Sequence, residues 1–250
     1  SFFLIGGSQV STLGYNLKQR LKNYNYYHFS SNAFIYLSDF YKISIKNNKK
    51  DLAFVEKNKL IRNLLVSTNK KNIVLIGSRY PLFLNKSYFD NKEGGIEGLT
   101  YGDKFEHIED LNKKWQDGFK NSIEELSINK NIKIILLYPI PEIGFHIKVK
   151  LKNYKFLSKN ILDTSFDTSF EVYKDRTKSS FKLLDSIQSD NIYRVYPHKL
   201  FCDTTIKDRC VVHDDKNIFY YDDNHPSIKG SEMINDLIMK EIEKIELKSN

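Results

Sequence analysis

Short runs rich in apolar and aromatic residues alternate with longer stretches of helical periodicity, and this alternation constrains the fold more than any other feature. The short runs are SFFLI, YNYYHF, NIVLIG, IKIILLYP and IYRVYP. The first of the intervening stretches carries apolar residues at spacings of three and four, at Val10, Leu13, Leu17 and Leu21. Apolar strands separated by amphipathic helices are typical of a parallel sheet with both faces covered. The chain is therefore predicted to be an α/β protein, a three-layer α/β/α sandwich around a mainly parallel sheet.

The same periodicity predicts further helices and one long loop. A helix is expected around residues 60–65, another at about 172–187, and a last one with Ile234, Leu237, Ile238, Ile242 and Ile245 in its apolar stripe. Segment 85–103 is polar and carries glycines, so it is expected to be a loop. After that loop, one long helical face is predicted from Phe105, Ile108, Leu111, Trp115, Phe119, Ile123 and Leu126. Because no repeat or Pro/Gly-rich linker interrupts the chain, we expect a single domain over residues 1–250.

The composition is basic, but it does not indicate nucleic-acid binding. The formal net charge is +8, and the lysines are scattered rather than grouped in a stripe, so no nucleic-acid partner is expected. An acidic polymer or surface would suit this charge. No apolar stretch reaches the roughly 18–20 residues that a membrane span requires. The chain lacks an initiator Met and begins on a core strand, so we expect it to be the C-terminal part of a longer polypeptide with its targeting information upstream.

The first apolar run ends in Gly6, Gly7 and Ser8, where the chain passes from a strand into a helix. Ligands of open parallel sheets bind beyond the carboxyl ends of the strands, so Ser8 is placed on the ligand edge. Its hydroxyl and N–H would lie at a helix N-terminus, which can steady an anion. An ordinary N-cap serine is the alternative reading.

A second candidate segment, FYYDDNHPSIKGSEMI, precedes the last helix. Asp222 lies three residues before His225, close enough to fold back and accept a hydrogen bond from the imidazole. A carboxylate in that role fixes the tautomer, and the other ring nitrogen can then take a proton from a serine hydroxyl. The alternative is a polar turn that caps the last helix.

Cys202 and Cys210 are the only cysteines and lie in one polar loop, FCDTTIKDRC. A disulfide between them would contribute about 2–3 kcal/mol by loop-entropy arithmetic and would indicate an oxidising compartment. Two unpaired thiols in a cytosolic protein are the alternative. No CxxC motif or histidine cluster indicates a metal, and no cofactor is expected.

Taken together, these segments resemble the SGNH (GDSL-type) hydrolase superfamily, which has a nucleophilic serine in a first GDS block and a DxxH motif in the last. NIVLIGSRYPLFL is similar to the strand ending in an Arg-aromatic pair in SGNH domains fused to acyltransferase-3 membrane proteins. LLYPIPEIGFHI is similar to the PxPExGF segment of those domains, and the cysteine pair also fits them. The resemblance spans essentially the whole chain and implies a flavodoxin-like SGNH hydrolase fold.

Carried over residue by residue, the resemblance implies that Ser8 is the nucleophile, His225 the general base and acid, and Asp222, rather than Asp223, the orienting carboxylate. The Ser8 N–H would donate to the oxyanion.

Two more residues are implied as oxyanion or substrate contacts. Arg79 would donate to or hold an acyl or glycan oxygen, with a salt bridge to a loop acid as its alternative. Asn32, after the second strand, would be a further donor. For Glu142 we expect a structural salt bridge or cap.

The implied function is serine-dependent O-acyl transfer, of acetyl above all, onto a cell-envelope glycan such as lipopolysaccharide O-antigen or exopolysaccharide. An upstream acyltransferase-3 membrane domain would deliver the acyl donor, and the domain would be periplasmic or otherwise extracytoplasmic, tethered to the inner membrane.

The sequence also departs from the family pattern. Gly7 stands where the family has the Asp of GDS, and GSRYP replaces the Gly-x-Asn-Asp block of simple GDSL esterases. Two alternatives therefore stay open: a free-standing esterase that removes acyl groups from glycans or lipids, and a degenerate SGNH domain that only binds a glycan or a partner.

Overall fold

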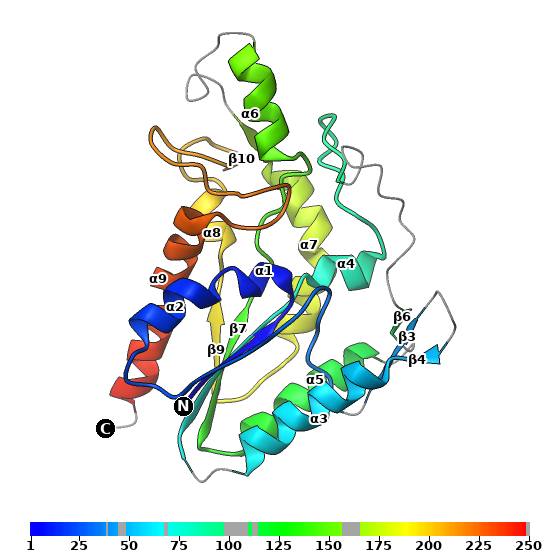
Figure 1. Cartoon of the computed structure of the whole chain (residues 1–250), viewed down its shortest axis with the longest axis vertical. Coiled ribbons are helices and arrows are strands. Elements are labelled where there is room, and N and C mark those ends of the chain that lie inside the picture. Colours follow the sequence, from blue (N-terminus) through cyan, green and yellow to red (C-terminus); the bar gives the residue numbers. More distant parts are fainter. Residues whose placement is uncertain are drawn as a thin grey trace.

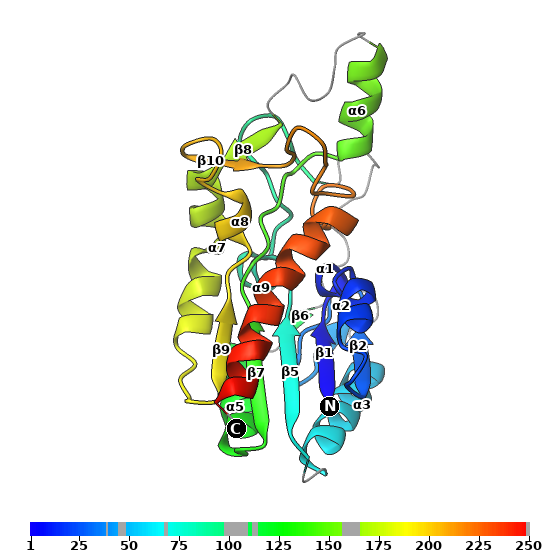
Figure 2. The ribbon, with the colours of Figure 1, turned by 90° about the vertical axis from the view of Figure 1, so that its left-hand side faces the viewer.

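The computed structural model describes residues 1–38, 40–44, 49–67, 70–97, 110–111, 115–156 and 166–248. At its centre is a five-stranded sheet in the order β2-β1-β5-β7-β9. The strands are β1 (Phe2–Gly6), β2 (Tyr26–Ser30), β5 (Asn72–Gly77), β7 (Ile132–Leu137) and β9 (Ile192–Val195). All four pairings are parallel, and Figure 2 shows the strand arrows pointing toward the same end of the molecule.

Helices cover both faces of this sheet, which confirms the predicted three-layer sandwich (Figures 1 and 2). Along β1, Phe2 and Leu4 face one core and Phe3 and Ile5 the other, because successive strand side chains point to opposite faces. The first core is closed by α1 (Ser8–Ser11), α2 (Gly14–Arg20) and α9 (Ile228–Leu247). The second is closed by α3 (Leu52–Val66), α4 (Tyr80–Asn85), α5 (Trp115–Ile128) and α7 (Phe170–Asp185).

Smaller elements lie outside the central sheet. The strands β3 (Lys42–Ser44), β4 (Lys49–Lys50) and β6 (Asp110–Leu111) form one antiparallel sheet, and β8 (Asp167–Ser169) pairs with β10 (Arg209–Val211). The remaining helices are α6 (Ile147–Phe156) and α8 (His198–Phe201). Within the described ranges, no helix combines the length and the apolarity needed to cross a membrane.

The five predicted strands and the helices at α3, α7 and α9 are confirmed, whereas other expectations need correction. The single helix predicted from Val10 to Leu21 is two helices, because the backbone turns at Thr12, whose Oγ1 donates to the carbonyl of Gln9 over 2.7 Å. The long helix is shorter than predicted: α5 starts at Trp115, and Leu111 belongs to β6, where it pairs with β3. Phe105 and Ile108 lie outside the described residues.

The stretch after β7, for which no regular structure was expected, contains α6. Its sequence, IKVKLKNYKF, alternates apolar residues with lysines as a strand does, so the helical period is hidden. The predicted loop begins inside α4, which ends at Asn85, and its described part runs to Glu97 with only an isolated bridge between Asp90 and Ile96. The rest of that loop, residues 98–103, lies outside the described residues.

Candidate active site

The turn after β1 brings Ser8 to the carboxyl edge of the sheet. Gly6 is required there by close approach, since a Cβ at this position would lie 2.1 Å from the carbonyl oxygen of Gly77 on β5. A glycine is not required at position 7. The φ of −77° and ψ of −176° of Gly7 are ordinary extended values, and a Cβ there would lie 3.5 Å from its nearest neighbour. Ser8 is the first residue of α1, so its N–H has no acceptor in a preceding helical turn.

The segment before α9 folds into a tight loop around the Asp222 carboxylate. Asp222 Oδ1 accepts from the backbone N–H groups of Asn224 and His225, over 3.0 and 2.8 Å. The same carboxylate contacts the imidazole, with His225 Nδ1 2.8 Å from Oδ2 and 3.0 Å from Oδ1. Asp222 therefore fixes both the backbone of the loop and the orientation of the ring. Ser227, rather than this loop, caps α9 by accepting from the N–H of Gly230.

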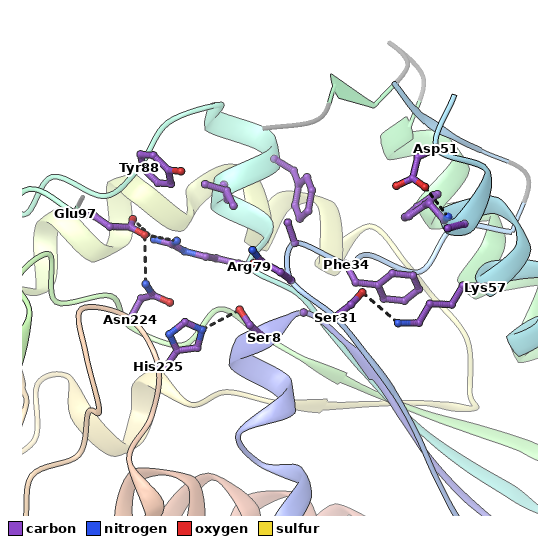
Figure 3. A pocket seen from close by; sticks show the side chains of 17 residues that line it. Ser8, Ser31, Phe34, Asp51, Lys57, Arg79, Tyr88, Glu97, Asn224 and His225 are labelled. Atoms are coloured by element: carbon purple, nitrogen blue, oxygen red, sulfur yellow. Dashed lines mark hydrogen bonds and ion pairs between the residues drawn. The ribbon is translucent and has the colours of Figure 1, made fainter. Parts of the chain in front are cut away.

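The two ends of the chain meet at this edge. His225 Nε2 lies 2.8 Å from Ser8 Oγ across a sequence separation of 217 residues, and Figure 3 shows the ring and the hydroxyl pointing toward each other. With Nδ1 donating to Asp222, Nε2 is the ring nitrogen that can accept the Ser8 proton. The structure thus brings together Ser8, His225 and Asp222 in the order and at the distances of a Ser-His-Asp triad.

Hydrogen bonds keep the carboxyl group of Asp222 ionised. Burial alone would raise the pKa of Asp222, but the donors from His225 and from the N–H groups of Asn224 and His225 outweigh burial and lower the pKa to about 2. The neighbouring Asp223 behaves in the opposite way. Burial, followed by the charges of Glu97 and Asp222, raises the pKa of Asp223. Among the described contacts, Asp222 is the carboxylate that meets the ring.

A cavity of about 660 Å³ opens beside Ser8 and His225. One wall comes from the loop after β2 and from the start of α3, and the other from Arg79, Glu97 and Asn224. Figure 3 shows Lys57, Ser31 and Phe34 on the first wall. Lys57 Nζ lies 4.3 Å from the centre of the Phe34 ring and 3.2 Å from Ser31 Oγ. A substrate would therefore reach Ser8 through a cavity that is partly apolar and has polar groups on both walls. The remaining lining residues are Gly7, Asn32, Ala33, Asp51, Ala53, Phe54, Leu82, Phe83 and Tyr88.

Arg79 lies in the cavity wall between two glutamates. Its Nε donates to Glu142 Oε1 over 2.5 Å and its Nη1 to Glu97 Oε1 over 2.6 Å, and Nη2 pairs with both acids. Glu142 continues the network to Arg176, whose Nε is 3.0 Å from Glu142 Oε2. The salt bridge expected for Glu142 is confirmed. A substrate oxygen that approached Arg79 would share the guanidinium with these carboxylates.

Asn32 lies at the exposed rim of the same cavity. It follows β2 in a turn where Ala33 has a φ of +47° and the N–H of Phe34 donates to the carbonyl of Ser31. The residue implied as a further donor thus lines the cavity that also contains Ser8.

Three residues that the sequence reasoning did not single out hold the histidine loop. Gln9 Nε2 donates to the carbonyl of Asn224 over 2.9 Å, which ties the residue after Ser8 to the residue before His225. Asn224 Nδ2 also lies 3.3 Å from Glu97 Oε1. Asn224 and Gln9 could have been suspected because each adjoins a triad residue, whereas Glu97 lies in a loop without any motif.

Cys202 and Cys210 form a disulfide. The bridge closes a polar loop between α8 and β10, and both cysteines are buried in the core that α9 covers. The unpaired alternative is therefore excluded.

With this geometry established, the chain can be assigned to a family. The family model described as "SGNH domain (fused to AT3 domains)" matches residues 1–240, so the chain belongs to that family, where AT3 denotes acyltransferase-3. The predicted resemblance is confirmed. At the level of the family this supports an enzyme of acyl transfer or ester hydrolysis. No curated protein sequence matches the chain.

Two solved structures are similar to this one. The periplasmic domain of a lipopolysaccharide acetyltransferase from Salmonella ser. Paratyphi A aligns with a TM-score of 0.59 at 16% identity, covering 96% of this chain and 82% of the other. At that identity the likeness supports the fold. A possible lipase from Chitinophaga pinensis aligns with a TM-score of 0.41 at 14% identity, covering 98% of each chain.

Proposed function

We propose that this domain transfers an acetyl group onto a hydroxyl of a cell-envelope glycan through an acyl-Ser8 intermediate. The observation that carries the proposal is the 2.8 Å contact between Ser8 Oγ and His225 Nε2, with Asp222 on the other ring nitrogen. A covalent serine ester divides acyl transfer into two easier steps.

In the first step Ser8 Oγ attacks the acyl carbonyl of the donor while His225 Nε2 takes the hydroxyl proton. The Oγ–carbon bond forms, the bond to the leaving oxygen breaks, and His225 returns the proton to that oxygen. In the second step the acceptor hydroxyl gives its proton to Nε2 and attacks the acyl carbon, the bond from that carbon to Ser8 Oγ breaks, and His225 returns the proton to Oγ. Asp222 stabilises the imidazolium formed in each step.

The negative charge on the carbonyl oxygen requires hydrogen-bond donors near Ser8. The Ser8 N–H, at the start of α1, is the first donor that we assign to it. Asn32 and Arg79 line the same cavity. We assign Asn32 the role of a further hydrogen-bond donor, and Arg79 a contact to an acyl or glycan oxygen.

Gly7 bears on whether the domain is catalytically degenerate. The contact of 2.8 Å between Ser8 Oγ and His225 Nε2 would suit catalysis although the family Asp is replaced, and the backbone at Gly7 has ordinary extended angles. Both observations favour an active enzyme over a domain that only binds.

We further propose that the domain works outside the cytoplasm, tethered to the inner membrane through an upstream AT3 domain that supplies the acyl donor. The family is one of SGNH domains fused to AT3 domains, and a disulfide is typical of proteins that fold in oxidising compartments. The acetyl group and the glycan acceptor are suggested by the Salmonella domain, whose parent is a lipopolysaccharide acetyltransferase.

The test is to compare Ser8→Ala and His225→Ala with the wild-type domain for 4-nitrophenyl acetate turnover and for acetyl transfer to envelope glycan. Each substitution is expected to lower turnover by about a thousandfold or more. Ser11→Ala, at the end of α1, and His213→Ala are matched controls expected to keep wild-type rates. A fluorophosphonate should label Ser8, as read by mass spectrometry. Equal activity in all five proteins would overturn the proposal, and turnover to free acetate alone would favour the esterase.

A further inference from the structure

The side-chain oxygen of Asn224 is a buried acceptor that no described residue satisfies. Asn224 is 5% exposed and lines the cavity next to His225. Its Nδ2 donates to Asp223 Oδ1 over 2.6 Å and lies 3.3 Å from Glu97 Oε1. Its Oδ1 has no hydrogen-bond partner within the described part of the chain. A buried polar atom without a partner is uncommon and unfavourable in a native structure.

The orientation of this carboxamide is fixed by its surroundings. Two carboxyl groups, Glu97 and Asp223, lie on one side, and a carboxylate can only accept, so the NH₂ group must face them. The backbone is held as well, because the N–H of Asn224 donates to Asp222 and its carbonyl accepts from Gln9. The oxygen is therefore directed away from the two acids, and Figure 3 shows it on the side of the group that faces Ser8.

An acceptor in this position cannot serve the acyl carbonyl, whose developing charge needs donors. Asn224 Oδ1 instead suits a hydrogen-bond donor on the second substrate, the acceptor of the acyl group. The attacking hydroxyl must reach His225 Nε2 to give up its proton, and Asn224 precedes His225 in the chain and shares its cavity. A second hydroxyl on the carbon next to the attacking one is the donor that would lie beside the imidazole and meet Oδ1.

We propose that Asn224 Oδ1 selects acceptors that carry two neighbouring hydroxyl groups, by accepting a hydrogen bond from the hydroxyl that is not acylated. The inference rests on the proposed function and specifies its acceptor: a vicinal diol, such as adjacent ring hydroxyls of a sugar, rather than an isolated alcohol. Asn224 acts on the substrate directly and is thereby a specificity-determining residue.

The experiment measures how the acyl-enzyme formed from 4-nitrophenyl acetate divides between water and an added alcohol. The alcohols are cis-1,2-cyclohexanediol and its monomethyl ether, which differ in one O–H donor. After correction for the two equivalent hydroxyls, the wild-type domain is expected to favour the diol by about fivefold to tenfold, the effect of one neutral hydrogen bond. In Asn224→Leu the ratio of diol to ether transfer is expected to fall to about one.

The ratio is independent of the overall rate, so a loss of turnover from a displaced His225 loop does not imitate the result. Asn32→Leu removes a carboxamide from the exposed rim of the same cavity and is expected to keep the wild-type ratio, whatever its rate. Nitrophenol release with equal transfer to diol and ether in the wild type would overturn this inference alone. Absence of nitrophenol release would overturn the proposed function and the inference with it.

Discussion

The Glu142→Gln substitution tests the ion-pair network behind the cavity. Glu142 lies between the guanidinium groups of Arg79 and Arg176, and the side chains of these three residues are 3%, 12% and 7% exposed. Burial raises the pKa of Glu142, but the two arginines outweigh it, so the pKa lies below its ordinary value and the group is ionised at neutral pH. Glutamine keeps the size and removes the charge.

The expected loss of stability depends on the hydrogen-bond and ion-pair partners that each arginine keeps when Glu142 is replaced. Breaking a buried ion pair by removing one partner costs about 3–5 kcal/mol, because a buried charge is left uncompensated. Arg79 keeps Glu97, whereas Arg176 keeps Ser87, which accepts from it through Oγ and through its carbonyl over 2.9 and 2.8 Å. We therefore expect the lower end of this range, about 3 kcal/mol, and a melting temperature lower by about 6–12 °C.

Urea unfolding followed by the fluorescence of the single tryptophan, the buried Trp115, measures this cost. The matched control is Glu93→Gln, which makes the same change in a surface pair with Arg209, where the two side chains are 37% and 29% exposed. Such a pair contributes less than about 1 kcal/mol. If the two variants unfolded within 1 kcal/mol of each other, the assignment of a stabilising role to the buried network would be refuted.

Two further predictions concern the turn and the triad. Gly7→Ala is expected to change the unfolding free energy by less than about 1 kcal/mol, whereas Gly6→Ala, whose Cβ would clash with the Gly77 carbonyl, should cost about 3 kcal/mol or more in the same assay. Equal costs would contradict the packing argument. The lowered pKa of Asp222 means that its stabilising effect is complete above its ordinary value of 3.8 and is lost as the pH falls through about 2. The stability difference between wild type and Asp222→Asn should therefore be constant above about pH 5 and shrink toward pH 2; a difference that persisted at pH 2 would count against the pairing with His225.

The sheet could be predicted from the sequence because its three inner strands, β1, β5 and β7, are nearly continuous apolar runs. The strand β5, for example, is buried at all six positions from Asn72 to Gly77, as expected for a parallel strand covered on both faces. The helix α6 could not be predicted, because lysines alternate with apolar residues along it. The strand β6 was concealed for another reason: Leu111 fits the apolar face of α5, and pairing with β3, a distant contact, decides its conformation.

The candidate site was predictable where a motif is local and not where it depends on the fold. The spacing of Asp222 and His225 places both groups on one loop, so their contact follows from three residues of sequence. The contact with Ser8 required the parallel topology, which sets the β1–α1 turn at the carboxyl edge of the sheet. The Asn224 carboxamide gained its orientation from Glu97, a loop residue 127 positions away, and no sequence pattern encodes that approach.

The two residues of the reactive pair are 217 positions apart in the chain, and this separation has a consequence for biosynthesis. The serine leaves the ribosome more than two hundred residues ahead of its proton acceptor. A nascent chain therefore carries a hydroxyl with no base beside it until α9 has docked. Under the proposed mechanism, ester turnover would therefore report only those copies in which the two segments have come together.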